Sequence, residues 1–215
     1  MQKDIASIRE EYLLSELDES EVLANPVEQF ENWFNQAIQS KIVDVNAMTL
    51  CTVDQHNIPN GRNVLLKGIE NNEFRFFTNY NSQKGKEILV NPHVTLVFYW
   101  KELQRQVRIR GSVQKISEEE SIEYFQSRPR ESQIGAWVSH QSEILSDRKE
   151  LENKTKKFEL EFKQLEQIPK PDYWGGFAVS PIYIEFWQGR ASRLHDRICY
   201  SLQNDGTWKK NRLSP

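Results

Sequence analysis

Arginine, histidine and aspartate crowd a five-residue segment near the end of the chain, RLHDR, which lies between aromatic and strand-forming residues. In an extended segment, Arg193, His195 and Arg197 point to one side. Leu194 and Asp196 then point to the other. Three cationic or titratable groups on one side repel one another unless an anion or an electron-rich ring lies against them. Taken alone, the segment favours a surface cluster of ion pairs over a ligand site, and both interpretations stay open.

A second group of polar side chains surrounds a proline in the segment YFQSRPRES. Tyr124 and Arg128 are four residues apart on a predicted helix, so they are neighbours. Pro129 disfavours helical geometry at Arg128, and the helix is therefore predicted to end there, with Ser132 at the entry to the next segment. Two hydroxyls and a guanidinium near a helix start can bind a phosphate group. A capped helix junction with ordinary ion pairs is an equally weighted alternative.

Two predicted strands carry further cations. Arg62 and Lys67 flank the run RNVLLK, at positions that a regular strand turns to opposite sides. The two side chains could then bind two different anions, or a twist of the strand could bring them to the same one. For this segment alone, the favoured interpretation is that both are strand-end charges in solvent. In RQVRIR, Val107 and Ile109 share a face that suits a core. The other face is polar and either lines a pocket or meets solvent; it carries Gln106, Arg108 and Arg110.

These groups must be positioned by a strand-rich fold with helices around it. The first forty or so residues are predicted to be helical, with Pro26 at a first helical position. Strand-like runs cover residues 47–53, 62–69, 74–80, 93–100, 105–116, 177–189, 198–203 and 207–213, and helical runs cover 82–92, 117–142 and 147–167. Hairpins rather than regular βαβ crossovers join the strands. The pattern therefore predicts a mainly β, α+β protein: an antiparallel barrel with peripheral helices.

The composition argues against several classes of protein. The formal net charge of the 215-residue chain is −3 and its cations form no stripe, which disfavours binding along a nucleic-acid backbone. Cys51 and Cys199 lie in strand-like runs without a CxxC pair, which predicts buried thiols in a reducing compartment. The four histidines lack metal-ligand spacing, and neither a secretory signal nor a membrane-spanning run is recognised. We expect a cytoplasmic protein that has no metal site.

Several of these motifs occur together in an order that resembles one known family. RNVLLK, FFTN, SQKGKEI, RQVRIRG, SRPRESQIGAWVSHQS, YWGGF, FWQG and RLHDR resemble the pyridoxamine 5′-phosphate oxidase family from the REEY segment to the last residue. The resemblance implies an FMN-binding split β-barrel that forms a homodimer, with FMN at each end of the subunit interface. It implies one domain over residues 1–215, with 1–20 as a mobile N-terminal helical segment and 21–215 as a core that includes C-terminal dimerisation strands.

The resemblance also implies an activity. Members oxidise pyridoxine 5′-phosphate and pyridoxamine 5′-phosphate to pyridoxal 5′-phosphate with O2, which yields H2O2, and NH3 from the amine. The reaction belongs to vitamin B6 biosynthesis and salvage. Flavin accepts the hydride, while the protein positions the substrate carbon against it. Two alternatives stay open: a split-barrel protein that binds FMN or pyridoxal phosphate without turnover, and another flavin oxidoreductase on the same fold.

The residues that match the family's FMN ligands come from several predicted strands and helices. They are Arg62, Asn63, Val64, Leu65, Leu66, Lys67, Phe77, Thr78, Gln83, Lys84, Gln106, Gln141, Ser142, Trp187 and Arg197. Four of them are expected from the partner subunit, namely Gln141, Ser142, Trp187 and Arg197. At position 83 many members have an arginine, so one charge-assisted bond is expected to be lost here. At position 77 a phenylalanine replaces a frequent tyrosine, which removes a hydroxyl.

The residues that match the substrate site include the side chains that were described above as able to bind a phosphate. Lys67, Tyr124, Arg128 and Ser132 match the phosphate clamp, and the two catalytic residues, Arg193 and His195, match groups over the substrate ring. Arginine can lie on an electron-rich pyridine ring, and histidine can orient the substrate or accept a proton. Arg9 and Tyr12 match an N-terminal segment that can fold over the site.

Overall fold

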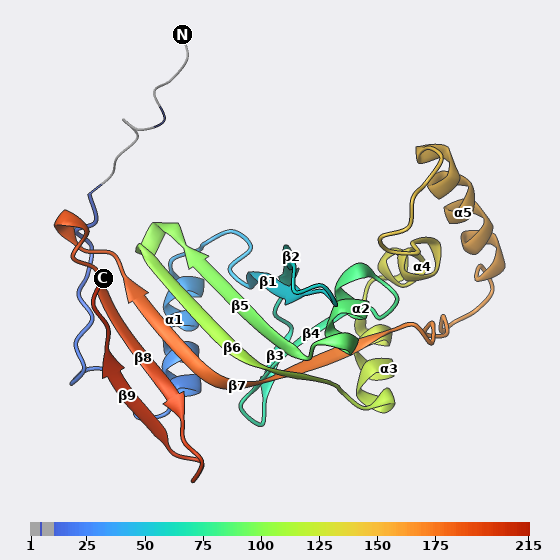
Figure 1. The fold of residues 1–215 in the computed structure, drawn as a ribbon. Coiled ribbons are helices and arrows are strands. Elements are labelled where there is room, and N and C mark those ends of the chain that lie inside the picture. Colours follow the sequence, from blue (N-terminus) through green and yellow to red (C-terminus); the bar gives the residue numbers. More distant parts are fainter. Residues whose placement is uncertain (1–4, 6–10) are drawn as a thin grey trace. The chain divides into compact units, whose positions relative to one another are not determined.

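The computed structural model describes Ile5 and residues 11–215. The described chain forms two compact units (Figure 1). The terminal unit comprises the described residues up to 50, together with 95–111 and 181–215; the middle unit comprises 51–94 and 112–180. Four strands pass from one unit into the other: β1 (Ala47–Val53), β5 (His93–Trp100), β6 (Arg105–Lys115) and β7 (Trp174–Gln188). The interpretation of residues 1–215 as a single domain stays a prediction.

The strands form one sheet in the order β2-β1-β5-β6-β7-β4-β3, and β8 pairs with β7 and β9. The remaining strands are β2 (Pro59–Leu65), β3 (Gly68–Glu70), β4 (Glu73–Asn79), β8 (Asp196–Leu202) and β9 (Trp208–Arg212). The pairs β3–β4, β4–β7, β7–β8 and β8–β9 are antiparallel. This largely antiparallel sheet with helices outside it confirms the predicted fold class.

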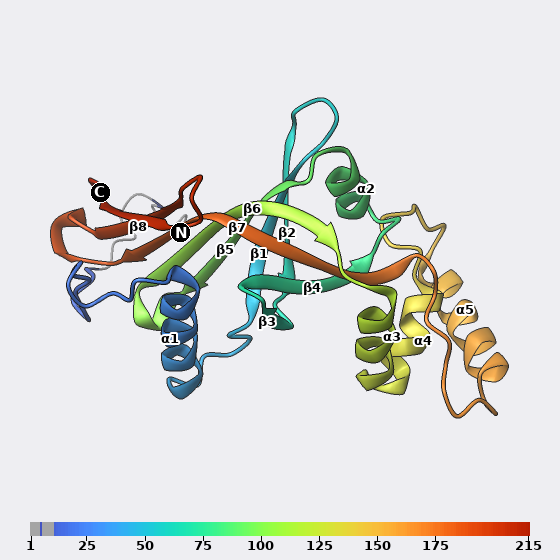
Figure 2. The same cartoon turned by 90° about the horizontal axis from the view of Figure 1, so that it is seen from below.

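In the terminal unit, α1 (Pro26–Gln39) lies beside the strands (Figure 2), and its buried residues include Phe30 and Trp33. Asn25 caps the helix by accepting the Val27 N–H, and Pro26 takes the first turn, where its missing N–H costs nothing. The rings of Phe30 and Phe98 lie 4.9 Å apart, centroid to centroid. Packing the two rings against each other removes apolar surface of both side chains from water. The predicted amphipathic helix is confirmed here.

Helix was the wrong prediction for the described residues 11–24, which contain none. The Asp18 carboxylate accepts the Ser20 N–H at 2.8 Å and holds a local turn, a bond that competes with helical pairing. The backbone of Leu17 bonds to side chains of Asp196 and Arg212 instead of to its own chain neighbours. The segment therefore follows partners that are distant in sequence, which local periodicity does not reveal.

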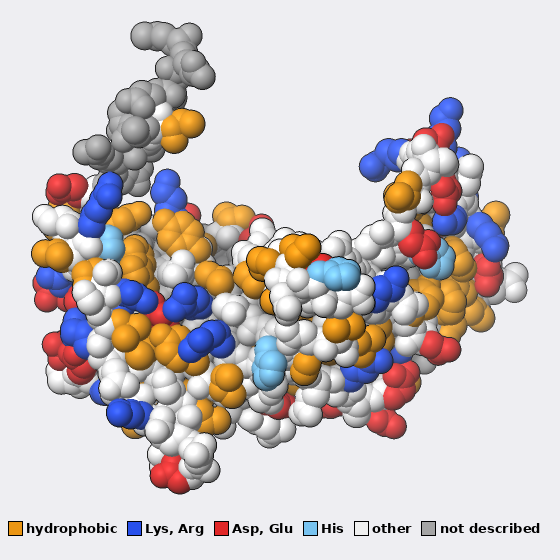
Figure 3. Space-filling view, viewed as in Figure 1, with side chains coloured by type: hydrophobic (Ala, Val, Ile, Leu, Met, Phe, Trp, Pro, Cys, Tyr) orange, Lys and Arg blue, Asp and Glu red, His pale blue; other side chains and the backbone are white. Residues whose placement is uncertain are grey.

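β6 and the C-terminal strands complete the terminal unit. Val107 and Ile109 are fully buried, as their alternation predicted. A 3₁₀ turn at Lys101–Leu103 joins β5 to β6, and the predicted turn before β9 closes at Gly206, whose φ of +82° is readily adopted by glycine. On the face drawn in Figure 3, Lys and Arg side chains lie among apolar and acidic ones over these strands.

In the middle unit, β2 and β3 replace the single strand predicted over residues 62–69. The break falls at Leu66 and Lys67, where the Lys67 N–H turns to the Arg75 carbonyl of β4 at 2.8 Å. The aromatic side chains of β4 fill the core of this unit, since Phe74 and Phe76 are fully buried. Lys67 thus lies at the end of a strand rather than within one.

Four helices flank the strands of the middle unit: α2 (Gln83–Val90), α3 (Glu118–Ser127), α4 (Arg130–Val138) and α5 (Arg148–Glu161). Ser117 and Glu120 form the predicted capping box at the start of α3. Arg128 has an extended conformation (φ −76°, ψ 150°), so the chain breaks before Pro129 as predicted. α3, α4 and α5 share an apolar cluster with Trp174 that contains Phe125, Ile134, Val138, Phe162 and Ile168. No helix in the described part of the chain is long and apolar enough to cross a membrane.

Candidate active site

A cavity of about 460 Å3 opens in the middle unit between the end of β2, β4 and the junction of α3 with α4. Its lining consists of Asn63, Val64, Leu65, Lys67, Phe77, Thr78, Lys84, Tyr124, Arg128, Pro129, Ser132, Gln141 and Trp174. Three of these side chains are cationic, and none of the described residues that line the cavity is acidic. A concave surface with this donor set favours an anionic ligand. We call it the cationic cavity.

The break at Pro129 brings Tyr124, Arg128 and Ser132 into this one cavity. The guanidinium of Arg128 lies 4.7 Å above the Trp174 ring, which holds it by a cation–π contact. Its Nη1 is buried and has no hydrogen-bond partner in the described part of the chain. Burial lowers the pKa of Arg128, an effect that the nearby Tyr124 partly offsets. An unpaired buried guanidinium is costly unless an anion binds it, so a ligand phosphate fits here.

Lys84 anchors the other side of the cavity. Its Nζ donates to Thr78 Oγ1 at 3.2 Å and to Gln141 Oε1 at 3.1 Å. Burial lowers the pKa of Lys84, and the positive charge of Arg62 lowers it further. A partly desolvated ammonium gains more than an exposed one from a bound anion.

Gln141 and Ser142 were expected to contact the flavin from the partner subunit, which stays a prediction; within this chain they lie beside Lys84 and Gln83. Gln141 lines the same cavity as Thr78 and Lys84. The hydroxyl of Ser142 accepts the Gln83 N–H at 3.1 Å. The chain after α4 returns to the start of α2, which a motif read along the sequence does not show.

Arg62, a predicted flavin ligand, pairs with a buried carboxylate that the sequence analysis did not identify. Its Nη2 lies 3.1 Å from Glu87 Oε2, and its Nη1 donates to the Thr52 hydroxyl. Asn60 Nδ2 donates to the other carboxylate oxygen at 3.1 Å. Burial raises the pKa of Glu87, but these bonds and the Arg62 charge outweigh it and leave the pKa lowered. A glutamate on the buried side of α2, beside Ile88, was the available signal.

Not every residue matched to the flavin lines the cavity. Leu66 is buried and Gln83 is exposed, and neither belongs to the lining. Asn63, Val64, Leu65, Lys67, Phe77, Thr78 and Lys84 do belong to it, and Pro129 and Trp174 are lining residues that the sequence analysis missed. Trp174 lies in the YWGGF motif, so its position was visible although its role was not.

A second cavity of about 290 Å3 shares Lys67, Phe77 and Tyr124 with the first. The rings of Phe77 and Tyr124 stack with centroids 3.8 Å apart. The rest of this second lining is mixed in charge and includes Arg75, Glu70, Glu120 and Glu123. Because Arg75 pairs with Glu70 and Glu120 at 2.7 Å each, the second cavity lacks the cationic character of the first.

The terminal unit holds the other predicted site residues, and the RLHDR segment is not extended there as predicted. Ala191–Arg193 forms a 3₁₀ turn, and Arg193 itself has a φ of +61°. β8 begins only at Asp196, so the regular alternation assumed for Arg193 fails. Arg193 is exposed, and no ion pair of its guanidinium is found among the described residues.

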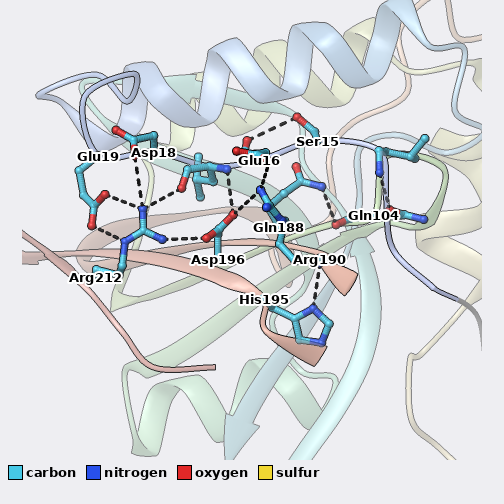
Figure 4. Close-up of polar contacts among 12 residues, drawn as sticks. Ser15, Glu16, Asp18, Glu19, Gln104, Gln188, Arg190, His195, Asp196 and Arg212 are labelled. Carbon is cyan, nitrogen blue, oxygen red and sulfur yellow. Dashed lines mark hydrogen bonds and ion pairs between the residues drawn. The ribbon is translucent and has the colours of Figure 1, made fainter. Parts of the chain in front are cut away.

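His195 lies next to this turn, with its ring directed to Arg190 (Figure 4), and aromatic rings pack against it. Its ring centroid is 4.7 Å from that of Trp187 and 5.6 Å from that of Tyr12. Its Nδ1 accepts the backbone N–H of Arg190 at 3.1 Å, which leaves the proton of a neutral ring on Nε2. Burial lowers the pKa of His195, and the charge of Arg193 lowers it further, while Asp196 opposes both. His195 can therefore donate a hydrogen bond from Nε2 at neutral pH.

Arg197 belongs to an ion-pair cluster instead. Its guanidinium pairs with Glu185 at 2.9 Å and donates to the Ser214 carbonyl at 2.8 Å. Arg108, on the polar face of β6, pairs with the same carboxylate at 2.6 Å. Gln106 lies two residues earlier on that face and is partly exposed. The two interpretations of RLHDR thus divide between its residues: Arg197 is ion-paired, whereas Arg193 and His195 stay available to a ligand. Arg9 lies outside the described residues.

Comparison with known proteins agrees with these features. A sequence model described as "Pyridoxamine 5′-phosphate oxidase" matches residues 34–161, more than half of the chain. A second, described as "Pyridoxine 5′-phosphate oxidase C-terminal dimerisation region", matches residues 174–215. Proteins named pyridoxine/pyridoxamine 5′-phosphate oxidase from Trichormus variabilis and Leptospira interrogans are 51% and 52% identical over 215 residues, each covering 100% of both chains.

Solved structures share the fold. The crystal structure of PhzG from Burkholderia lata 383, in complex with tetrahydrophenazine-1-carboxylic acid, has a TM-score of 0.87 at 24% identity and covers 94% of this chain and 99% of that one. A pyridoxamine 5′-phosphate oxidase-related, FMN-binding protein from Nostoc punctiforme has a TM-score of 0.69 at 16% identity, covering 86% and 97%. Together with the full-length relatives, the sequence match shows that this chain is an oxidoreductase of the pyridoxamine 5′-phosphate oxidase family.

Proposed function

We propose that the chain catalyses the FMN-dependent oxidation of pyridoxine 5′-phosphate and pyridoxamine 5′-phosphate to pyridoxal 5′-phosphate. O2 is the final oxidant and yields H2O2, and the amine substrate also releases NH3. The family supports the reaction class. The observation that supports phosphorylated ligands is the charge of the cationic cavity. Its described lining has three cationic side chains and no acidic one.

The donor set of the cavity fits FMN. Lys84, Thr78 and Gln141 form a bonded group on one side, and the β2 residues Asn63, Val64 and Leu65 form the adjoining wall. Arg62 adds a charge that Glu87 holds in place. When bound, the flavin accepts a hydride from the substrate carbon. The protein's part is to fix the flavin phosphate and ring by these contacts.

The substrate phosphate is proposed to bind Lys67, Tyr124, Arg128 and Ser132. The unpaired Nη1 of Arg128 supports this assignment, since a phosphate oxygen would satisfy it. A phosphate handle gives binding energy remote from the reacting carbon, which fixes that carbon in a reactive position. Arg193 is proposed to lie on the substrate ring, and His195 to donate its Nε2 hydrogen bond near the reacting carbon.

A homodimer is proposed as the working assembly. The matched dimerisation region contains Trp187, Arg193, His195 and Arg197. We propose that these residues complete the cationic cavity of the partner subunit, with one FMN at each end of the interface. The free thiols of Cys51 and Cys199 suit the reducing cytoplasm, which we propose as the compartment.

Aerobic turnover of the FMN-loaded protein tests the function. Pyridoxine 5′-phosphate and pyridoxamine 5′-phosphate are supplied separately, and pyridoxal 5′-phosphate and H2O2 are followed together. We expect both products in equal amounts, and Arg193→Ala to lower turnover far more than flavin content. A yellow protein that forms neither product would instead be a binding protein, and the proposal would fail.

A further inference from the structure

Residues 12–23, which we call the N-terminal strap, are tied to the strands of the terminal unit through Leu17. Leu17 is buried, and side chains bind both of its backbone groups. Its N–H donates to Asp196 Oδ2 at 3.1 Å, and its carbonyl accepts from Arg212 Nη2 at 3.0 Å. Further along, the Tyr200 hydroxyl donates to the Leu23 carbonyl at 2.7 Å. The strap is therefore bound at both Leu17 and Leu23, although it contains no helix or strand.

Arg212, the last residue of β9, is the centre of this attachment. Its Nε and Nη2 donate to the two carboxylate oxygens of Glu19 in a bidentate pair. Its Nη1 donates to Asp196 Oδ1 at 2.7 Å. One guanidinium thus joins a strap carboxylate, a strap carbonyl and a strand carboxylate. Single exposed ion pairs contribute little, but a bidentate arginine within a network holds a defined geometry.

Tyr12, at the start of the strap, packs against Trp187 and His195 of the same unit. Its ring lies edge-on to Trp187 at 5.7 Å and to His195 at 5.6 Å, centroid to centroid. A Cβ on Gly189 would come within 2.7 Å of the Tyr12 ring, so the approach requires a glycine there. Leu14 N–H donates to Gln104 Oε1 at 3.3 Å and fixes the stretch between Tyr12 and Leu17.

Asp196 contacts both the strap, through Leu17, and Arg190, the hydrogen-bond partner of His195. Arg190, whose backbone N–H binds His195 Nδ1, also lies 3.5 Å from the Asp196 carboxylate and 2.8 Å from Glu16 of the strap. We propose that Asp196 and Arg212 are positioning residues, which hold the strap so that Tyr12 stays over His195 and Trp187. The consequence for turnover rests on the proposed function; the attachment itself does not.

Protease accessibility tests the attachment without reference to activity. A glutamate-specific protease is applied to the FMN-loaded full chain, and cleavage after Glu16 and Glu19 is followed by mass spectrometry. We expect Arg212→Ala to speed these cleavages on the order of tenfold, because local opening becomes easier. Lys209→Ala, at an exposed residue of the same strand, is the control and should leave the rate unchanged. Equal rates in Arg212→Ala and the unchanged protein would overturn the proposal.

A double-mutant cycle tests whether Arg212 acts through Tyr12. Arg212→Ala, Tyr12→Ala and the double variant are compared in kcat/KM, with flavin content and thermal midpoint measured for each. We expect each single variant to lose on the order of tenfold, and the double variant to lose no more than Tyr12→Ala alone. Additive losses would mean that Arg212 acts elsewhere, which contradicts the proposal. If the unchanged protein shows no turnover, the proposed function fails, and the protease result still decides whether the strap is held.

Discussion

Arg62 Nη2 lies 3.1 Å from Glu87 Oε2, so a buried carboxylate of α2 sets the direction of an arginine of β2. The Thr52 hydroxyl donates to the same oxygen and accepts from Arg62, which closes a three-membered network. Only about a twentieth of the Glu87 side chain is exposed, against a fifth of Arg62. The carboxylate is therefore the fixed partner, and the arginine keeps access to a ligand.

Replacing Glu87 by glutamine removes the charge that holds Arg62 and keeps the side-chain volume. We expect Glu87→Gln to lower the free energy of unfolding by about 1.5–3 kcal/mol, the range for a hydrogen bond to a charged group. FMN affinity should fall as well, because Arg62 loses its fixed orientation. Urea denaturation and fluorimetric FMN titration measure the two effects. Lys86→Gln, at an exposed position of the same helix, is the matched control; equal behaviour of the two variants would refute a positioning role for Glu87.

Arg128 offers a sharper test of the phosphate assignment. We expect Arg128→Lys to raise KM for pyridoxine 5′-phosphate by roughly tenfold or more, because a lysine lacks the planar pair of donors. Turnover at saturating substrate should change much less. Unphosphorylated pyridoxine is the internal control: whatever residual oxidation of it occurs should be equally slow in both proteins. A KM unaffected by Arg128→Lys would move the substrate phosphate away from this arginine.

Position 83 allows a test by gain of affinity. Gln83 is the exposed first residue of α2, next to Lys84, where many family members have an arginine. We expect Gln83→Arg to tighten FMN binding by about fivefold, the difference of about 1 kcal/mol between a charged and a neutral hydrogen bond. Gln83→Glu should weaken it, because it places a negative charge near the flavin phosphate. Affinities that move in the same direction for both variants would show that charge at this position does not matter.

Some features could be predicted because they depend on neighbouring residues. Pro129 ends α3 through its own ring, and Ser117 with Glu120 caps α3 within one turn. Tyr124, Arg128 and Ser132, the proposed phosphate clamp, line one cavity because that local break turns the chain. A pattern of a few residues contains all of this information.

Other features depend on residues that are distant along the chain. The strap at Leu17 is bound by Asp196 and Arg212, which lie almost the whole sequence away. Helical periodicity therefore gave the wrong secondary structure for residues 11–24. Gln141, in the turn after α4, accepts from Lys84 of α2, which lies 57 residues earlier in the chain. Alternation also failed at Arg193, because a 3₁₀ turn with positive φ replaces the extended segment that it assumes.

Gly85 in α2 tests how tightly the helix packs against Tyr80, the residue that follows β4. A Cβ at this position would lie 2.1 Å from the Tyr80 carbonyl oxygen, which is backbone and cannot move aside alone. We expect Gly85→Ala to lower the free energy of unfolding by about 1–3 kcal/mol through overpacking. Gly135→Ala in α4 is the contrast, since nothing lies within 4 Å of its added Cβ; it should stabilise by about 0.5–1 kcal/mol. Urea denaturation decides, and a stable Gly85→Ala protein would contradict the close approach.

The pKa of His195 makes the last prediction, and its direction follows from the surroundings of the ring. Burial and the Arg193 charge lower this pKa from its ordinary value of 6.5. The neutral ring is favoured in the folded chain, so His195 adds stability above pH 6.5 and this contribution is lost as the pH falls through the lowered pKa. We expect an NMR titration of the flavin-loaded protein to give a pKa below 6.5, with the His195→Gln spectrum assigning the signal. Arg193→Gln should raise the pKa because one positive charge is removed, whereas Lys209→Gln should not. A pKa above 6.5 would contradict the neutral ring described here, because a protonated Nδ1 cannot accept the Arg190 N–H. A pKa indifferent to Arg193→Gln would show that the Arg193 charge does not act on the ring.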